Sequence, residues 1–448
     1  MIPASPLFDQ STLTALLDHD PLVADYRTFF ALLDWPVVDQ WEAERSSRGR
    51  PAHPEAAYLK AFLIRIREGI LYTAQLRRFL VRHPLLILEL GFYLVLDPTQ
   101  PYGFDVERTL PCEYWLRQKL RTFDRDLLHA LLQGTVQALQ DEIPGLGETV
   151  AFDVKHMYAW VKENNERVYV PERSDKTQRL AGDPDGRLGV KRSTNIQLDH
   201  GSTDEKKELI WGYGTGLAAS IVAGYGAVVL AEYTQPFNEN DLTYFRSLYR
   251  QTVLALDHYP THLVGDAAFD AWYVYDAAAR HGGIAAVPLN QHSKTPFARL
   301  PDGTPRCPIG LPMHPTKQFN HTYGYRSQRF QCPLLFPEQT GEICEHEQFA
   351  KGRGCVKDVN WELGGIQRVT LDRNGPLYHA LHVQRSGCER INALAKERGI
   401  ERPRVRNARS VANLNTLIYL VVNVQVLSKA KSINASLLPI QKGVRQMN

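Results

Sequence analysis

The first part of the chain carries apolar residues at helical spacing. Through Tyr58–Arg67 and again through Leu127–Leu139, apolar positions recur every three to four residues, which is the spacing of one face of an α-helix. Prolines punctuate the segment at Pro36, Pro51, Pro54, Pro84, Pro98 and Pro101. The pattern predicts helices from about Ser11 to Gly145 and an all-helical N-terminal domain over residues 1–146.

The pattern changes at Glu148, where β-forming residues and alternation replace the helical repeat. Strands are predicted at Thr149–Asp153, Gly214–Val222, Ala227–Tyr233 and His262–Val264. Helices are predicted at Asn240–Leu256, with Asp241 as a candidate cap, and at Ala271–Arg280. Strands mixed with helices indicate an α/β or α+β core, whose first part spans residues 147–288.

Residues 289–371 differ from both neighbours, because Pro, Gly, Cys and His become frequent. Short strands are predicted at Tyr323–Gln331 and Gly365–Leu371, so the segment is interpreted as a β-rich insertion in the core. Helix returns near Leu377, and a final apolar helix runs from Ser410 to about Leu427 after a Pro- and Arg-rich break. Residues 372–448 therefore form the second part of the core and the C-terminal helices.

Composition narrows the class of protein. The 448 residues are 44% hydrophobic and 23% charged, as in soluble globular proteins. The net charge is only +3, so a nucleic-acid-binding surface would have to be local. The N-terminus lacks a signal-peptide pattern, and the apolar run Leu417–Leu427 is too short to span a bilayer. We expect a cytoplasmic protein with reduced thiols and no membrane partner.

Two aspartates end predicted buried strands. Asp153 closes Val150-Ala-Phe-Asp153, and Asp266 closes His262-Leu-Val-Gly-Asp266. A carboxylate there is costly unless it is paired or binds a cation, although a lone strand-terminal aspartate more often caps the next helix. Together with Glu389 on a later helix, the two aspartates form an acidic set that can bind two Mg²⁺ or Mn²⁺ ions for phosphodiester chemistry.

Glu389 has cations at helical spacing on both sides. Arg385 precedes it by four residues, and Lys396 follows Arg385 by eleven, about three turns of α-helix. The spacing predicts that all three side chains share one helix face. The two cations either contact DNA phosphates or form weak ion pairs with Glu389.

These blocks resemble those of DDE transposases of bacterial insertion sequences, the group with a Y-x2-R-x3-E-x6-K signature. Three residues match the signature in identity and spacing: Arg385, Glu389 and Lys396. His382 occupies the tyrosine position, and Tyr378 lies one turn earlier. Val150–Asp153 is similar to the first acidic block and Leu263–Asp270 to the second, while Arg48–Pro54 resembles part of the N-terminal domain of such proteins.

The resemblance implies a ribonuclease-H-like core, with a mixed sheet flanked by helices and split by the insertion. It implies binding to the terminal inverted repeats, cleavage of the DNA ends and joining of the 3′-hydroxyl to target DNA by a homodimer on paired ends. In a bacterial cell such a protein would be nucleoid-associated when bound to DNA. The implied catalytic and Mg²⁺-binding residues are Asp153, Asp266 and Glu389, and the implied DNA contacts near them are Arg385, Lys396 and His382.

Further basic residues either form solvated faces or bind DNA phosphates. They are Arg48, Arg50, Arg77, Arg78, Lys191 and Arg192. Trp361, in the insertion, either stacks on a displaced base or packs in a core. The four cysteines of the insertion either bind one structural Zn²⁺ or are free, partly buried thiols, since no C-x2-C pair is present. They are Cys307, Cys332, Cys344 and Cys355.

Three other functions remain open on the sequence. A metal-dependent DNA nuclease would cleave without joining strands. A descendant of a transposase that no longer uses its catalytic residues would only bind DNA. A zinc-dependent hydrolase would be built on the cysteine segment.

Overall fold

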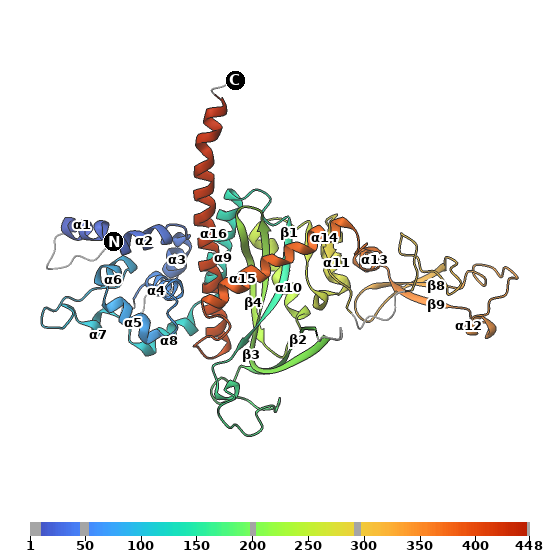
Figure 1. Cartoon of the computed structure of the whole chain (residues 1–448), viewed down its shortest axis with the longest axis horizontal. Helices are drawn as coiled ribbons and strands as arrows, with labels where there is room; N and C mark the ends of the chain where they lie inside the picture. The colour runs from blue at the N-terminus through green and yellow to red at the C-terminus, as the bar shows by residue number, and fades with distance from the viewer. Residues whose placement is uncertain (1–9, 45–52, 198–202, 291–296, 446–448) are drawn as a thin grey trace. The chain divides into compact units, whose positions relative to one another are not determined.

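The structure is a computed structural model that describes residues 10–44, 53–197, 203–290 and 297–445 (Figure 1). The chain divides into two compact units. The first comprises residues 1–146, 154–257 and 387–448, and the second comprises 147–153 and 258–386. This is a division into compact units, so the four domain boundaries expected from the sequence remain predictions. The fold is α+β, with a mixed sheet flanked by helices.

Helices fill the N-terminal part of the first unit, as the apolar spacing predicts. They are α1 (Gln10–His19), α2 (Pro21–Phe30), α3 (Trp35–Ala43), α4 (Glu55–Arg67), α5 (Thr73–Val81), α6 (Pro84–Leu90), α7 (Val106–Thr109), α8 (Glu113–Thr122) and α9 (Arg125–Glu142). Aspartate caps fix several of their starts. Asp20 accepts hydrogen bonds from the backbone N–H groups of Leu22 and Val23, each at 2.9 Å, which satisfies donors that the first helical turn leaves unpaired.

The main sheet begins with β1 and continues through the first unit. Its strands there are β1 (Thr149–Tyr158), β2 (Arg187–Gln197), β3 (Thr203–Val222) and β4 (Gly226–Pro236). Strand β3 pairs antiparallel with β2 up to Gly212 and with β4 from Tyr213 onwards. Helix α10 (Leu242–Leu256) follows. Asp241 makes no side-chain capping bond. Asn240 instead accepts a hydrogen bond from the N–H of Leu242 at 2.9 Å. The capping residue is therefore Asn240, one residue before the predicted Asp241.

Helix α16 (Ala408–Arg445) is the core helix of the first unit and extends well beyond the predicted end near Leu427. It packs against α9 and β4, and Figure 1 shows it beside α9. By length and composition its segment Ala408–Leu437 could cross a membrane, but 94% of its most apolar window is buried inside the protein. One of its buried polar residues, Asn423, exchanges hydrogen bonds of 2.9 and 2.8 Å with the backbone of Val229.

A buried ionic network ties three elements of the first unit together. Glu232 on β4 is fully buried and accepts hydrogen bonds from Arg125 at 3.0 Å and Thr416 at 2.6 Å. His129 Nε2 lies 3.2 Å from the same carboxylate oxygen. Burial alone would raise the pKa of Glu232, but Arg125, His129 and Thr416 outweigh burial and lower the pKa to about 2.

The second unit contains the parallel part of the sheet. The first residues of β1 pair in parallel with β5 (His262–Val264), and β5 pairs in parallel with β6 (Ile284–Ala286). The helices of this unit include η2 (Ala267–Phe269), α11 (Trp272–Ala279), α13 (Leu363–Thr370), α14 (Pro376–His382) and η3 (Val383–Arg385).

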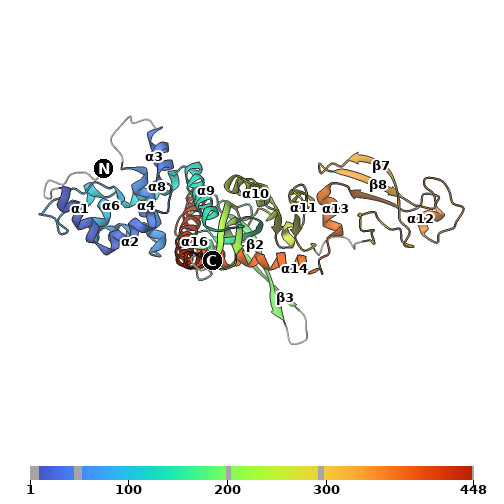
Figure 2. The same ribbon diagram turned by 90° about the horizontal axis from the view of Figure 1, so that it is seen from above.

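Helix α13 corrects the strand predicted at Gly365–Leu371. Its β-branched residues suggested a strand, but the segment forms a helix whose buried residues are Gly364 and Gly365. The helix lies beside α11, as Figure 2 shows. The approach is close at Gly364, because a Cβ there would meet the carbonyl oxygen of Trp272 at 2.3 Å. Burial against α11 therefore outweighs local β-propensity.

The insertion forms a small antiparallel sheet with its own core. Its strands are β7 (His314–Asn320), β8 (Arg326–Gln331) and β9 (Val356–Asn360), in the order β7-β8-β9, and α12 (Glu347–Ala350) precedes β9. The strand predicted from Tyr323 thus begins at Arg326. The buried residues of this core are Cys307, Met313, Phe330, Cys332, Leu334, Cys355 and Val359.

Candidate functional site

Asp153 and Asp266 occupy equivalent positions on neighbouring parallel strands. The strand register pairs Ala151 with Val264, and each aspartate lies two residues beyond its member of that pair. The backbone of Asp266 is still extended, with φ −81° and ψ −179°. Because side chains alternate along a strand and adjacent strands lie about 4.8 Å apart, both carboxylates project from the same face at the carboxyl edge of β5. Both residues are half-buried.

Asp266 also caps the turn that follows β5. Its Oδ1 accepts the N–H of Ala268 at 2.9 Å, which is the structural role that the sequence left open. A carboxylate has two oxygens and about four acceptor sites. One capping bond therefore orients the group and leaves most of its acceptor sites for a metal ion or water. Capping and metal binding are therefore compatible at this residue.

The donor chemistry of the aspartate pair fits Mg²⁺. Across the described ranges, no group of three or more His, Cys, Asp or Glu side chains is arranged so that it could hold a metal ion. Mg²⁺ is usually bound by one or two carboxylates together with water and substrate phosphates. Two neighbouring aspartates meet that requirement.

A nearby acidic residue has a purely structural role. Asp270 has a fully buried side chain and accepts two hydrogen bonds from Arg368, at 2.7 and 2.6 Å. The N–H of Asn290 also donates to it at 2.9 Å. Burial opposes ionisation, but Arg368 and Asn290 lower the pKa of Asp270 overall. This bidentate pair links the turn after β5 to α13. Asp270 therefore has a structural role, whereas Asp266 is a candidate metal ligand.

Glu389 lies on α15 (Ser386–Glu397) in the first unit and is exposed. Cys388 before it is fully buried, so the thiol points away from the side on which the carboxylate is exposed. Lys396, on the same helix, forms an ion pair with Glu401 at 3.1 Å. Lys155 lies 3.6 Å from the same carboxylate. The partner of Lys396 in the structure is thus Glu401, rather than the Glu389 considered from the sequence.

His382 and Arg385 belong to the second unit. A 3-10 turn over Val383–Arg385 interrupts the predicted helix, so Arg385 lies just before the α-helix that contains Glu389 and Lys396. The ring of His382 stacks on Tyr378, with centroids 5.5 Å apart and planes at 12°. Burial lowers the pKa of His382, Arg385 and His379 lower it further, and Asp266 opposes them. Nε2 of His382 is buried without a hydrogen-bond partner in the described part of the chain.

The other predicted DNA contacts are spread over the chain. Arg77 forms an ion pair with Glu107 at 2.8 Å, whereas Arg78 is exposed. Both line a cavity of about 370 Å³ on the helical segment. Lys191 is exposed on β2. Three residues cannot be placed further, because the side chain of Arg192 and the whole of Arg48 and Arg50 lie outside the described residues.

The cysteines of the insertion gather in one place. The thiol of Cys355 lies within hydrogen-bond distance of Cys332 and close to Cys307, and burial together with these neighbours raises the pKa of Cys355. Cys344 is half-buried and packs against the same core. Trp361 packs there too, with its ring 5.2 Å from that of Phe330. Its base-stacking role therefore stays a prediction.

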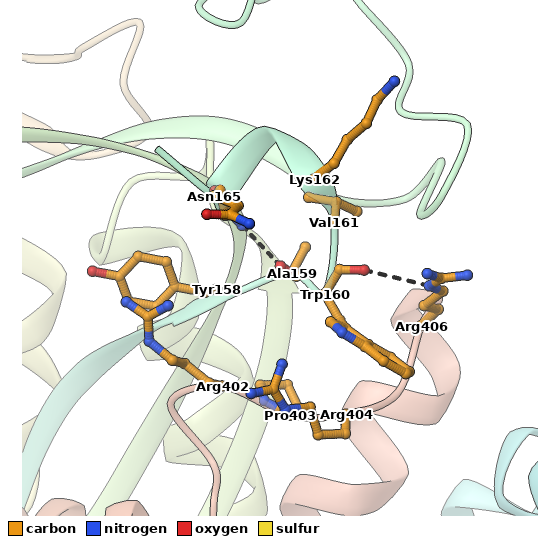
Figure 3. A pocket seen from close by; sticks show the side chains of 11 residues that line it. Tyr158, Ala159, Trp160, Val161, Lys162, Asn165, Arg402, Pro403, Arg404 and Arg406 are labelled. Carbon is orange, nitrogen blue, oxygen red and sulfur yellow. Dashed lines mark hydrogen bonds between the residues drawn. The ribbon is translucent and has the colours of Figure 1, made fainter. Parts of the chain in front are cut away.

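Sequence analysis missed a basic, aromatic pocket in the first unit. The pocket has a volume of about 350 Å³ and is lined by the end of β1 and by the segment after α15 (Figure 3). Tyr158 and Trp160 supply its aromatic rings, and Arg402, Arg404 and Arg406 supply its charges. The available signal was the Arg-rich break at Glu401–Arg406, which the sequence pattern marked only as the end of a helix.

No protein-family model and no curated protein sequence matches the chain. Among solved structures, the chain is similar to a piggyBac transposase in a synaptic complex with hairpin DNA, determined by cryo-electron microscopy. The two share 10% sequence identity with a TM-score of 0.34, and the similarity covers 93% of this chain and 76% of that chain. Because both values are low, function is inferred from the residues of this chain.

Proposed function

We propose that the chain is a DNA transposase that binds the terminal inverted repeats of an insertion sequence, cleaves the DNA ends and joins the 3′-hydroxyl to target DNA. The observation that carries the proposal is the matched placement of Asp153 and Asp266 on neighbouring parallel strands. The motif around Glu389 supplies the third carboxylate. Double-stranded DNA is the partner, and a homodimer acts on paired ends.

The chain's part in this chemistry is to position and neutralise charge. Asp153, Asp266 and Glu389 hold two Mg²⁺ ions, which supply activation of the nucleophile and stabilisation of the leaving oxygen. The capping bond from Ala268 keeps the Asp266 carboxylate in one orientation. Arg385 and Lys396 contact phosphates, because a charge-assisted hydrogen bond to a phosphate is stronger than a neutral one.

The insertion contributes a structural Zn²⁺ in this proposal. Zn²⁺ takes four sulfur or nitrogen ligands, and the donors here are Cys307, Cys332, Cys344 and Cys355. Three of them are buried in one small core and Cys344 packs against it, but these described residues are not arranged as a group that could hold a metal ion, so zinc binding would require the four thiols to move closer together. Because a thiolate is the form that binds zinc, the metal would replace the thiol–thiol contact between Cys332 and Cys355.

A strand-transfer assay tests the function. The protein is incubated with Mg²⁺ and a duplex carrying one element end, either intact or pre-cut with a 3′-hydroxyl, together with target DNA. We expect nicking of the intact end and joined product from the pre-cut end. Asp153→Asn and Asp266→Asn should abolish both products. The matched control is Asp257→Asn, since Asp257 is exposed and has φ +55°, a conformation that asparagine tolerates.

The same assay separates the alternatives. Nicking without joined product would identify a nuclease. DNA binding without either product, unchanged in Asp153→Asn, would identify a descendant that uses only its DNA-binding surface.

A further inference from the structure

The basic, aromatic pocket has walls that hydrogen bonds hold in place. The backbone N–H of Tyr158 donates to the carbonyl of Glu401 at 2.9 Å, which keeps the Arg-rich segment beside the end of β1. Arg406 Nε donates to the carbonyl of Trp160 at 3.3 Å. The amide of Asn164 donates to the carbonyls of Ala159 and Trp211 at 2.8 and 2.7 Å. The turn after β1 is therefore fixed at both ends.

The arginines of the pocket lie over aromatic rings. The guanidinium of Arg402 lies 4.0 Å from the ring centre of Tyr158, and those of Arg406 and Arg404 lie 4.9 and 6.0 Å from Trp160 (Figure 3). A guanidinium that contacts a ring through its face keeps its N–H donors in its own plane, pointing outward. The rings thus orient the guanidinium groups, while most of the N–H donors of these groups remain able to bind a ligand.

No carboxylate lines the pocket, whose lining residues are all described, although that of Glu208 accepts a hydrogen bond from the hydroxyl of Tyr158. Lys162 adds a fourth cation. Within the described ranges, Arg402, Arg404 and Arg406 form no ion pair with a carboxylate. Uncompensated cations in a concave site attract anions. Planar guanidinium groups match the oxygens of a phosphate in a bidentate manner.

A second cavity continues the basic surface. It has a volume of about 300 Å³, shares Trp160, Arg404 and Arg406 with the first, and adds Arg117 and Arg121 from α8. The ring of Tyr72 lies 6.1 Å from that of Trp160 at the same place. Two adjoining cavities suit consecutive units of a polymer better than a single small anion.

We propose that the two cavities bind an unpaired DNA strand, with its phosphates on Arg402, Arg404 and Arg406 and its bases against the aromatic and guanidinium faces. A positively charged groove lined with aromatic rings is how proteins hold single strands. The proposal deepens the proposed function, because cleavage at an element end exposes unpaired nucleotides, but binding itself requires no catalysis.

Fluorescence anisotropy of the full chain with a labelled oligothymidylate tests the proposal without metal. We expect Arg404→Ala to weaken binding at least tenfold, which corresponds to about 1.4 kcal/mol, since it removes charge-assisted hydrogen bonds to a phosphate. The slope of log K against log salt should become shallower by about 0.7 for each phosphate of the single strand that the variant no longer neutralises. Arg404→Lys should give an intermediate loss of affinity, because lysine keeps the positive charge but lacks the paired N–H donors of a guanidinium group.

The controls decide between outcomes. Arg250→Ala, an exposed arginine on α10, should leave binding unchanged, and circular dichroism should show that each variant is folded. Wild-type affinity in Arg404→Ala and in Arg402→Ala would overturn the proposal. So would displacement of the oligonucleotide by an equal concentration of inorganic phosphate, or equal loss of duplex and single-strand binding. Strand transfer by a protein whose pocket variants bind single strands normally would refute this inference and leave the proposed function standing.

Discussion

Asp153 and Asp266 each lie two residues beyond the paired Ala151 and Val264 of parallel strands β1 and β5. The relationship brings together two carboxylates that are more than a hundred positions apart in the sequence. Parallel strands end at the same edge of a sheet, so equivalent positions on them lie side by side. A pair of this kind can share cations, and it gives the candidate site its chemistry.

His382 should influence how stability depends on pH. The pKa of His382 is lowered in the fold, so between its ordinary value of about 6.5 and the folded value the unfolded chain binds more protons. Stability therefore rises with pH in that window and falls as the solution becomes more acidic. In His382→Tyr this part of the pH dependence should be absent, as urea unfolding at several pH values would reveal.

The same variant also tests the signature. A tyrosine at this position can stack on Tyr378 as the imidazole does, so we expect strand transfer to be retained, whereas His382→Ala should reduce it. A pH dependence of stability identical in the wild type and His382→Tyr would show that the imidazole does not titrate as inferred.

Much of this picture follows from local pattern. The strand β5 occurs at the predicted residues His262–Val264, because an apolar run bounded by polar residues is a strong local signal. The strand predicted at Gly365–Leu371 failed because packing of α13 against α11 decides its conformation, and packing partners are distant in sequence. The length of α16 was underestimated since polar residues beyond Leu427 find distant partners, as Asn434 does with Glu142 on α9.

For the candidate site too, local sequence patterns were predictive, whereas contacts between residues distant in the sequence were not. Asp153 and Asp266 could be singled out because each closes an apolar run. The pairing of Lys396 with Glu401 could not be predicted from the sequence, because the spacing along one helix pointed to Glu389 as the partner. The arginine pocket could not be predicted either, since its aromatic rings and its arginines lie far apart in the sequence and meet through a backbone hydrogen bond between Tyr158 and Glu401.

Removing the buried carboxylate of Glu232 should destabilise the first unit. Glu232→Ala leaves Arg125 and His129 without their acceptor, and breaking a buried ion pair costs about 3–5 kcal/mol. Because the pKa of Glu232 is lowered to about 2, its contribution is complete above its ordinary pKa and is lost as pH falls toward 2. Denaturant unfolding at pH 7 measures the loss. Glu239→Ala, an exposed site, is the control, and equal stabilities of the two variants would contradict the network.

The cysteine core should contain one Zn²⁺ per chain after purification without chelator. Elemental analysis should show this zinc lost in Cys332→Ser and Cys355→Ser, and chelation should lower the melting temperature because metal binding contributes to folding. Cys112→Ser, a cysteine outside the insertion, should keep the metal. A wild-type protein without zinc, whose melting temperature a chelator does not change, would show that they are ordinary buried cysteines.

Metal rescue tests the central claim most directly. In Asp153→Cys and Asp266→Cys a sulfur ligand replaces oxygen, which Mg²⁺ binds poorly and softer divalent ions such as Mn²⁺ accept better. Cleavage of an element end should be lost with Mg²⁺ and recovered with Mn²⁺ in both variants, while Asp257→Cys behaves as the wild type with either ion. Full activity of both variants in Mg²⁺ would contradict the assignment of these aspartates as the metal ligands of a transposase.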